Sequence, residues 1–298
     1  MFSSSTQSSV LSTQSSPMNL WVTGGGYVTA GGYGRRSEGK LVLRSAGGSA
    51  MLPLGDPVIP KGKEIFERPL SRYGRFDRYT KMGCAAVALA LRDAGLDRAT
   101  HKRNIGIVSS SIFECSETDE AYYATTLDGD GALASPNLFS YTLPGIVHGE
   151  CAVHFLLAGP TIAVGEPPPA ASRPFRPGLP ALLTAARLTE AGKAEIMLAG
   201  WIESPPAPAQ EEKTDSDGAA GRDMATRPDG TVSPLPADPG RVAKAPLPSG
   251  ALFVVLETRL RETLRDGNAV PPLPLVFLQG TLKGRDGKPV ESLLDLCL

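Results

Sequence analysis

The chain has little cysteine, little net charge and no long apolar run. Its 298 residues include four irregularly spaced cysteines without a CxxC pair: Cys84, Cys115, Cys151 and Cys297. This spacing favours free thiols in a reducing cytoplasm over a disulfide framework. The net charge of −1 and the pI near 6.3 do not indicate nucleic acid or an anionic membrane as a partner.

The sequence also lacks membrane-spanning and secretory patterns. No apolar run approaches the roughly 20 residues that would span a bilayer. The N-terminal stretch MFSSSTQSSVLSTQSSP has neither the basic n-region nor the apolar h-region of a secretory signal. We therefore expect residues 1–17 to be a disordered polar tail, and the protein to be cytoplasmic.

Glycine and proline, in contrast, are abundant and clustered. The 33 glycines and 27 prolines concentrate in tails and linkers. From residue 205 the chain reads PPAPAQEEKTDSDGAAGRDMATRPDG, with few apolar and many charged residues. Such a segment cannot bury enough apolar surface to offset the entropy of ordering it. We predict one domain over 18–204, a mobile loop over 205–248, and the remaining strand–helix–strand of the same domain with a short tail over 249–298.

Apolar periodicity predicts alternating strands and helices. The expected strands cover 19–23, 105–109, 161–164, 195–199, 250–257 and 273–279, and the expected helices cover 80–94, 144–157, 179–191 and 258–265. Three glycines, Gly95, Gly159 and Gly192, would end helices, and the triplet at 24–26 would break the first strand. We expect 41–70 to be irregular. The alternation implies an α/β layered fold with a parallel or mixed sheet.

Five segments carry, in order, a resemblance to a known family. They read WVTGGGYVTAGGYG, GRFDRYTKMGCAAVALALRDAGL, NIGIVSSS, then GPTIAV followed by GLPALLTAARL, and finally SGALFVVLETRLRETLRDG. Together they are similar to the β-ketoacyl synthases, the condensing enzymes of fatty-acid and polyketide synthesis. The resemblance implies a thiolase-like layered fold. It covers the N-terminal half of that fold, a mixed sheet with helices packed on it.

The resemblance also shows where a catalytic residue is missing. In the family, a segment like GPTIAV leads into a turn that carries the nucleophilic cysteine, and the next helix opens like GLPALLTAARL. Here that turn is the proline-rich GEPPPAASRPFRP. Counting from either side places the cysteine near Pro168 or Phe175, so we expect no catalytic residue in this chain. The family's C-terminal half supplies two histidines, and no HGTxT-like or GFGGxN-like segment occurs here.

Two further patterns could indicate a ligand site or only structure. The glycines of GGGYVTAGG follow a strand, but Thr29 stands at the third glycine position of GxGxxG, which favours a turn over a dinucleotide site. His148, Cys151 and His154 fall three apart on one expected helix, with no fourth ligand at a suitable spacing. We interpret them as helix packing and expect neither a metal nor a cofactor.

Cys115 and Ser172 are the other nucleophile candidates. Cys115 is flanked by Glu114 and Glu117, which would raise the pKa of its thiol. Ser172 has no general base nearby in the sequence. We expect neither residue to be reactive.

Two aromatic residues are candidates for binding rather than chemistry. Phe139 lies in the segment 135–141, which resembles family positions near the acyl pocket and the dimer contact. We propose it as an acyl-tunnel or interface residue. Trp201 directly follows an apolar strand pattern, and it either fills the core or lines an acyl tunnel.

Three functions remain open. The first is a non-catalytic subunit similar to chain-length factors, which would form a hetero- or homodimer and act with a catalytic β-ketoacyl synthase and an acyl carrier protein. The second is a 3-oxoacyl acyl-carrier-protein synthase completed by another chain, which would need a cysteine here. The third is a module that binds acyl chains or acyl carrier protein, with Arg173, Arg176 and the basic stretch 72–81 facing the acidic carrier protein. The chain keeps the segments that resemble the family's fold but lacks the cysteine turn, and this combination favours the first function.

Overall fold

The computed structural model describes residues 16–46, 49–127, 131–169, 175–205, 247–261 and 271–297. Most of the expected N-terminal tail and of the expected 205–248 loop lies outside these residues, as does Ser172. The predictions made for those segments therefore stay predictions.

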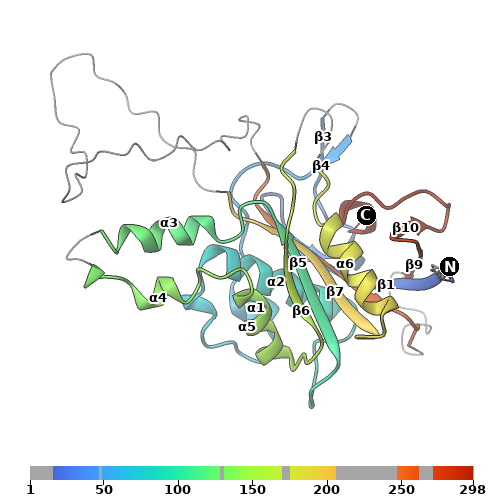
Figure 1. Cartoon of the computed structure of the whole chain (residues 1–298), viewed down its shortest axis with the longest axis horizontal. Helices are drawn as coiled ribbons and strands as arrows, with labels where there is room; N and C mark the ends of the chain where they lie inside the picture. The colour runs from blue at the N-terminus through green and yellow to red at the C-terminus, as the bar shows by residue number, and fades with distance from the viewer. Residues whose placement is uncertain are drawn as a thin grey trace, which may run out of the picture.

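One mixed sheet of eight strands forms the centre of the molecule (Figure 1). Its order is β10-β9-β1-β8-β7-β5-β6, with β2 paired to β1. β5 runs parallel to β6 and β7, whereas the other pairings within the described part of this sheet are antiparallel. The strands are β1 Met18–Thr29, β2 Gly32–Arg35, β5 Ile105–Ser111, β6 Thr161–Gly165, β7 Ile196–Glu203, β8 Gly250–Glu257, β9 Leu273–Leu278 and β10 Thr281–Gly284.

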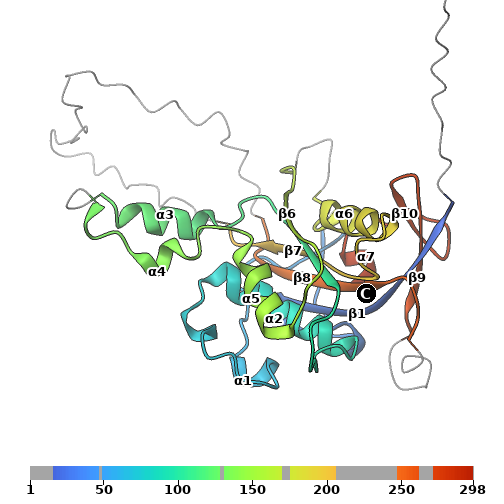
Figure 2. The ribbon, with the colours of Figure 1, turned by 60° about the horizontal axis from the view of Figure 1, so that its bottom comes forward.

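Helices cover both faces of this sheet, as the α/β prediction requires. Figure 2 shows α1, α2 and α5 on one face and α6 and α7 on the other. Two further helices, α3 and α4, extend away from the sheet. The helices are α1 Gly62–Ile65, α2 Arg78–Asp93, α3 Ser116–Ala124, α4 Pro136–Phe139, α5 Ile146–Phe155, α6 Leu179–Glu190 and α7 Leu294–Cys297.

Helix α2 confirms the predicted helix at 80–94. It starts two residues earlier because the Asp77 side chain accepts a hydrogen bond from the Thr80 N–H at 2.9 Å, which makes Asp77 the N-cap. It ends at Gly95, which has φ +67°. There the Leu96 N–H reaches back to the Leu91 carbonyl at 2.6 Å, the bond that closes a Schellman-type end.

The prediction that the glycine triplet breaks the first strand is wrong. Strand β1 continues through the triplet to Thr29. Helix α2 lies against this strand so closely that two of the glycines have no room for a side chain. A Cβ on Gly24 would stand 2.5 Å from the Ala94 nitrogen, and one on Gly26 would stand 2.3 Å from the Ala86 carbonyl oxygen. The glycines therefore bring a helix close to the sheet, and they make no turn.

Helix α5 is shorter than the predicted 144–157. It begins at Ile146 after a turn that contains Pro144, and it ends at Leu156, which is left-handed with φ +56°. Gly159 is not the stop that was expected. A Cβ there would lie 2.5 Å from the Gly106 nitrogen, so Gly159 lets the chain pass close to β5.

Three other segments also differ from expectation. The region 41–70 contains the hairpin of β3 (Arg44–Ala46) and β4 (Ser49–Met51), together with α1, so it is not wholly irregular. After β9 the chain forms β10 and α7 rather than only a tail. The described part of the expected 258–265 helix, residues 258–261, is a bend, and the rest lies outside the described residues. The strands predicted at 105–109, 161–164, 250–257 and 273–279 and the helix at 179–191 are confirmed, and the 195–199 strand continues to Glu203.

Candidate functional site

Polar side chains gather where the three parallel strands β5, β6 and β7 end. Strand β5 finishes with Ser109, Ser110 and Ser111, all buried. Successive strand side chains point to opposite faces, so Ser110 faces α6 while its two neighbours face α2 and α5. The carboxyl ends of parallel strands share one edge, which is where ligand sites of α/β folds form. This edge is the candidate functional site.

Glu203 closes β7 at this edge with a fully buried carboxylate. Its oxygens accept hydrogen bonds from the Ser111 hydroxyl at 3.1 Å, the Ile112 N–H at 2.8 Å and the Phe113 N–H at 3.0 Å. Burial raises the pKa of Glu203 to about 7, although these donors favour its charged form. The side chain holds together the end of β7 and the turn that follows β5.

Glu166 directly follows β6 and is also buried. Its Oε1 accepts hydrogen bonds from the Ser110 hydroxyl at 3.1 Å and from the backbone N–H of Gly178, the N-cap of α6. Its Oε2 is buried without a hydrogen-bond partner. Burial raises the pKa of Glu166 to about 7, and the charge of Glu203 raises it further. The carboxyl therefore links both ends of the segment that joins β6 to α6.

Two carboxyls that titrate near neutrality can hold and release a proton at pH 7. Neither of them lines either of the two cavities described below. Within the described residues, the hydrogen bonds of both carboxyls are to the backbone and side chains of neighbouring segments.

The two positions at which the resemblance would place a cysteine, Pro168 and Phe175, both lie among the described residues. Pro168 lies in the coil after β6, and Phe175 packs edge-on against Trp201, with ring centroids 5.8 Å apart. The four cysteines are buried elsewhere in the fold. Arg173, one of the basic residues proposed to face a carrier protein, lies outside the described residues.

The pKa of the Cys115 thiol is raised, as expected, but mainly by burial and not by the two flanking glutamates. Cys115 caps α3, and burial together with the neighbouring Asp119 raises the pKa of its thiol to about 12. Glu114 contributes less, and Glu117 instead accepts a hydrogen bond from the Ser204 hydroxyl. The burial of Cys115 depends on the folded structure and cannot be predicted from its neighbours in the sequence.

His148 and Cys151 pack in the protein interior, whereas His154 is partly buried and lines one of the two cavities. His148 Nε2 lies 2.8 Å from the Ser109 hydroxyl, and burial lowers the pKa of the imidazole to about 4. The Cys151 sulfur lies 3.6 Å from that of Cys84, and the His154 ring stacks edge-on against an aromatic side chain. Within the described residues, no three histidine, cysteine or acidic side chains are grouped to hold a metal ion.

The two aromatic candidates occupy opposite environments. Trp201 is fully buried in β7, directly opposite Ser110 in the neighbouring strand, and its Nε1 has no hydrogen-bond partner. Phe139 is 61% exposed on α4 and stacks on Tyr122 at 5.4 Å. Neither residue lines either of the two cavities.

The unpaired indole N–H of Trp201 leads to a testable prediction. A buried donor without a partner lowers stability, and phenylalanine removes it while keeping most of the apolar ring. We therefore expect Trp201→Phe to change the free energy of unfolding by less than about 1 kcal/mol. Removing the unpaired donor stabilises the fold, and this gain offsets the stability lost with the smaller side chain. Urea denaturation monitored by circular dichroism measures this. A loss well above that value would mean that the N–H has a partner in solution.

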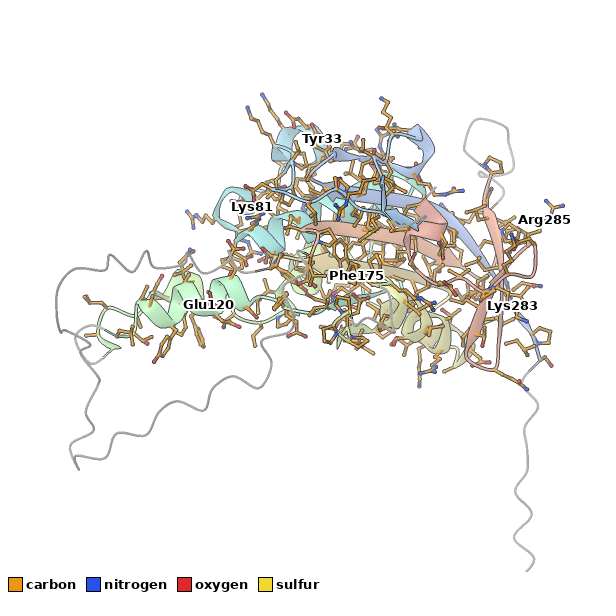
Figure 3. All side chains as sticks on the ribbon, turned by 90° about the horizontal axis from the view of Figure 1, so that it is seen from above. Tyr33, Lys81, Glu120, Phe175, Lys283 and Arg285 are labelled. Atoms are coloured by element: carbon orange, nitrogen blue, oxygen red, sulfur yellow. The ribbon has the colours of Figure 1, made fainter. Side chains whose placement is uncertain are left out.

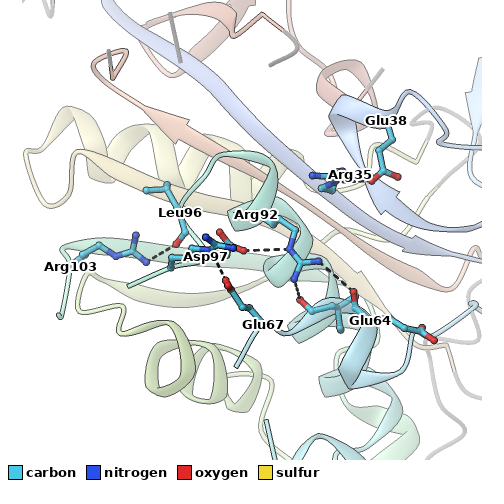
Figure 4. A network of polar contacts seen from close by, with 10 residues as sticks. Arg35, Glu38, Glu64, Glu67, Arg92, Leu96, Asp97 and Arg103 are labelled. Atoms are coloured by element: carbon cyan, nitrogen blue, oxygen red, sulfur yellow. Dashed lines mark hydrogen bonds and ion pairs between the residues drawn. The ribbon is translucent and has the colours of Figure 1, made fainter. Parts of the chain in front are cut away.

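The cavities of about 120 Å³ and 580 Å³ lie together on another face, between α1 and the end of α2. Figure 4 shows the charges around them already engaged: Arg92 contacts Asp97 and the Glu64 carbonyl, and Glu67 pairs with Arg98. These contacts fasten α1 to the end of α2.

The basic stretch 72–81, proposed to meet a carrier protein, is partly neutralised within the chain. Arg72 pairs with Glu150 and Arg78 with Asp56, each at 2.7 Å. Arg176, the other basic candidate, lies 3.1 Å from Glu291. Fewer free cations than the sequence suggested are therefore available to an acidic partner.

Sequence reasoning missed both buried carboxyls. A signal for them exists, because each apolar strand run, TIAVG and IMLAGWI, is followed directly by a glutamate. An acidic residue at the carboxyl end of a buried strand indicates a site at that edge. That Glu166 and Glu203 lie at the same edge of the sheet depends on β6 and β7 both flanking β5, which local sequence does not reveal.

Comparison with known proteins supports the resemblance. No protein-family model matches the chain. A Streptomyces violaceoruber protein named for a granaticin polyketide β-ketoacyl synthase is 28% identical over 141 residues, covering 45% of this chain and 32% of the relative. A Streptomyces virginiae protein named for a polyketide β-ketoacyl synthase is 24% identical over 203 residues, covering 63% and 46%. The chain thus spans about a third to a half of the length of these relatives.

Solved structures share the fold. The ishigamide ketosynthase/chain length factor superposes with a TM-score of 0.51 at 17% identity, over 88% of this chain and 66% of that one. A β-ketoacyl synthase from Burkholderia phymatum superposes with a TM-score of 0.50 at 20% identity, over 87% and 63%. Among the described residues, no helix has the length and apolar character needed to cross a membrane. In sequence, the chain is therefore similar to part of two polyketide β-ketoacyl synthases, and in structure it has the thiolase-like fold of the ketosynthases.

Proposed function

We propose that the chain is a non-catalytic β-ketoacyl-synthase-like subunit. It would act with a cysteine-bearing condensing enzyme and an acyl carrier protein in fatty-acid or polyketide biosynthesis, as a chain length factor does. One observation carries the proposal: the segment between β6 and α6 contains no cysteine. The backbone N–H of Gly178, the N-cap of α6, instead donates to the Glu166 carboxyl.

The chemistry of a condensing nucleophile supports this assignment. A reactive thiolate needs a lowered pKa, which a helix N-terminus or a basic neighbour supplies. At α6 the Glu166 carboxyl already accepts the Gly178 N–H. Elsewhere burial raises the pKa values of the thiols of Cys84, Cys115 and Cys297. These features support a subunit that keeps the fold without a reactive thiol.

The test is a condensation assay with acyl-loaded and malonyl-loaded carrier protein. The purified chain alone should form no 3-oxoacyl product. Adding the cysteine-bearing synthase of the same organism should restore turnover, with a product length that depends on the presence of this chain. Mass spectrometry of the carrier-bound products measures both effects.

The Pro168→Cys variant is the matched control for the missing thiol. We expect it to stay inactive alone, because the Glu166 carboxyl keeps the α6 N-terminus occupied. Turnover by the unmodified chain alone would contradict the proposal. So would a synthase whose rate and product length are the same with and without the chain.

A further inference from the structure

Two of the four cysteines lie in contact in the core between α2 and α5. The Cys151 sulfur is 3.6 Å from the Cys84 sulfur, although the two residues are 67 positions apart in the chain. Each of the two side chains is only 1% exposed. Cys115 instead caps α3, and Cys297 belongs to the core on the opposite face of the sheet. All four cysteines are described, and the fold brings this pair of thiols together.

The two helices that carry these thiols pack closely because the residue beside Cys84 is a glycine. A Cβ on Gly83 would lie 2.7 Å from a methyl carbon of Val147, which stands one turn before Cys151 on α5. Any side chain at position 83 would therefore push α5 away from α2. Figure 2 shows the two helices side by side on one face of the sheet, where they share one apolar core.

Both helices are also held on the sheet, so the framework sets the distance between the thiols. On α5, His148 lies one turn before Cys151, and its Nε2 is 2.8 Å from the Ser109 hydroxyl of β5. On α2, the backbone lies directly against Gly24 and Gly26 of β1. Figure 3 shows side chains filling the body of the molecule around these elements. Such dense packing keeps the two helices, and hence the two sulfurs, in place.

We propose that Cys84 and Cys151 are an oxidisable dithiol, which a small peroxide converts to a disulfide between α2 and α5. A disulfide has an S–S length of about 2.05 Å, so the two sulfurs must approach each other by about 1.5 Å. Rotation of the two short side chains and a small shift of α5 are enough for this approach. The free thiols expected from the sequence are then the reduced state of the pair. This inference does not rest on the proposed function.

The oxidation balances with hydrogen peroxide as the oxidant. One sulfur attacks a peroxide oxygen: an S–O bond forms, the O–O bond breaks, and the hydroxide released leaves as water with the proton of that thiol. The second sulfur then attacks the sulfenic acid. The S–S bond forms, the S–O bond breaks, and a second water leaves with the proton of the second thiol. The two thiols lose two electrons, and the peroxide is reduced to two waters.

Burial makes this reaction slow, and the contact makes it selective. Burial, together with the neighbouring thiol of Cys151, raises the pKa of Cys84 well above its ordinary value, so little thiolate exists at neutral pH. Hydrogen peroxide is close to water in size, and local opening of α5 admits it to the core. Once one sulfur is oxidised, the other is already in contact with it. The disulfide therefore forms faster than further oxidation of the first sulfur.

The disulfide ties the two ends of a long part of the chain. Between Cys84 and Cys151 lie β5, which carries the three serines of the candidate site, and helices α3 and α4. Closing a loop of this length restricts the unfolded chain and so stabilises the folded one. We expect oxidation to raise the Tm by roughly 5–10 °C.

The experiment oxidises the full, folded chain with hydrogen peroxide, removes the peroxide with catalase, and alkylates the remaining thiols in denaturant. Mass spectrometry of the reduced chain should find all four cysteines alkylated. The oxidised chain should be a monomer that has lost two hydrogens and is alkylated at Cys115 and Cys297 only. Digestion with trypsin and with a protease that cuts after Glu150 separates Cys115 from Cys151, so the linked peptides identify the pair.

Cys297→Ala is the matched control, because Cys297 is also buried but lies on the other face of the sheet. This variant should form the same disulfide, and peroxide should raise its Tm as it does in the wild type. Cys151→Ala should form no disulfide within the chain, and peroxide should not raise its Tm. If Cys151→Ala fails to fold, the linked peptides of the wild type decide, because they identify both cysteines directly.

Three results would overturn the proposal. The first is a native chain that keeps all four thiols after prolonged oxidation. The second is a sulfinic or sulfonic acid at Cys84 or Cys151 without a linked peptide, which would mean that the second sulfur cannot reach the first. The third is a disulfide that joins two chains or involves Cys115 or Cys297, which would mean that the contact in the core does not direct the oxidation.

Discussion

Replacing Gly26 with alanine should destabilise the fold by about 3 kcal/mol or more, at the upper end of what overpacking costs. The added Cβ would lie 2.3 Å from the Ala86 carbonyl oxygen and 2.5 Å from the Ala90 nitrogen, both backbone atoms of α2. Backbone cannot rotate aside as a side chain can, so the whole helix must move away from β1. That movement loosens the packing of the core on this face of the sheet. Urea denaturation monitored by circular dichroism measures the loss.

Gly149→Ala is the matched control. Gly149 lies within α5, is exposed, and has no atom within 4 Å of the position that a Cβ would take. Alanine is the better helix former, so this variant should be more stable by about 0.5–1 kcal/mol. If Gly26→Ala were as stable as the wild type, α2 could not lie against β1 as closely as described.

Gly26 also shows what a single sequence can and cannot predict. The length and apolar character of the strand and helix patterns predicted β5, β8, α2 and α6, because those signals are local. A glycine triplet has two physical uses, a turn or a close approach of backbone, and nothing in its neighbours distinguishes them. Only the position of α2, about 60 residues further along the chain, shows that Gly26 serves the second use.

The candidate site was predictable in part. The loss of the cysteine between β6 and α6 follows from the sequence and its resemblance. Glu166 and Glu203 did not stand out, because 36 residues separate them in the chain and a single carboxyl after a strand is usually exposed. Their burial depends on the turn after β5 and on the start of α6, which are features of the assembled sheet.

That burial makes the stability of the fold depend on pH near neutrality. The pKa of Glu166 is about 7 in the folded chain, above its ordinary value of 4.5. Between these two pH values the folded state keeps a proton that the unfolded state has released, so the free energy of unfolding falls as pH rises through this range. A shift of this size corresponds to about 3 kcal/mol, which the protein has at low pH and loses above pH 7. Glu203, with its pKa also near 7, acts in the same direction.

Glu166→Gln isolates the contribution of this one carboxyl. Glutamine stays neutral at every pH, its oxygen can still accept from Ser110 and Gly178, and its amide takes the place of the unpaired Oε2. The variant should therefore match the wild type at pH 5 and be more stable by up to about 3 kcal/mol at pH 8. Glu203→Gln would not test this cleanly, because both oxygens of Glu203 accept backbone N–H groups and an amide nitrogen cannot.

Urea denaturation of the wild type and of Glu166→Gln at pH 5, 6, 7 and 8 measures the two pH profiles. The informative quantity is the difference between them, because titrating groups that do not interact with Glu166 contribute equally to both. Glu203 interacts with Glu166, so the difference also contains the change in the Glu203 titration. A difference that grows from pH 5 to pH 8 means that Glu166 folds with a proton, and that ionising the carboxyl in its buried position costs stability. Parallel profiles would show that Glu166 is already ionised in the folded chain, so that a charged carboxylate occupies the N-terminus of α6.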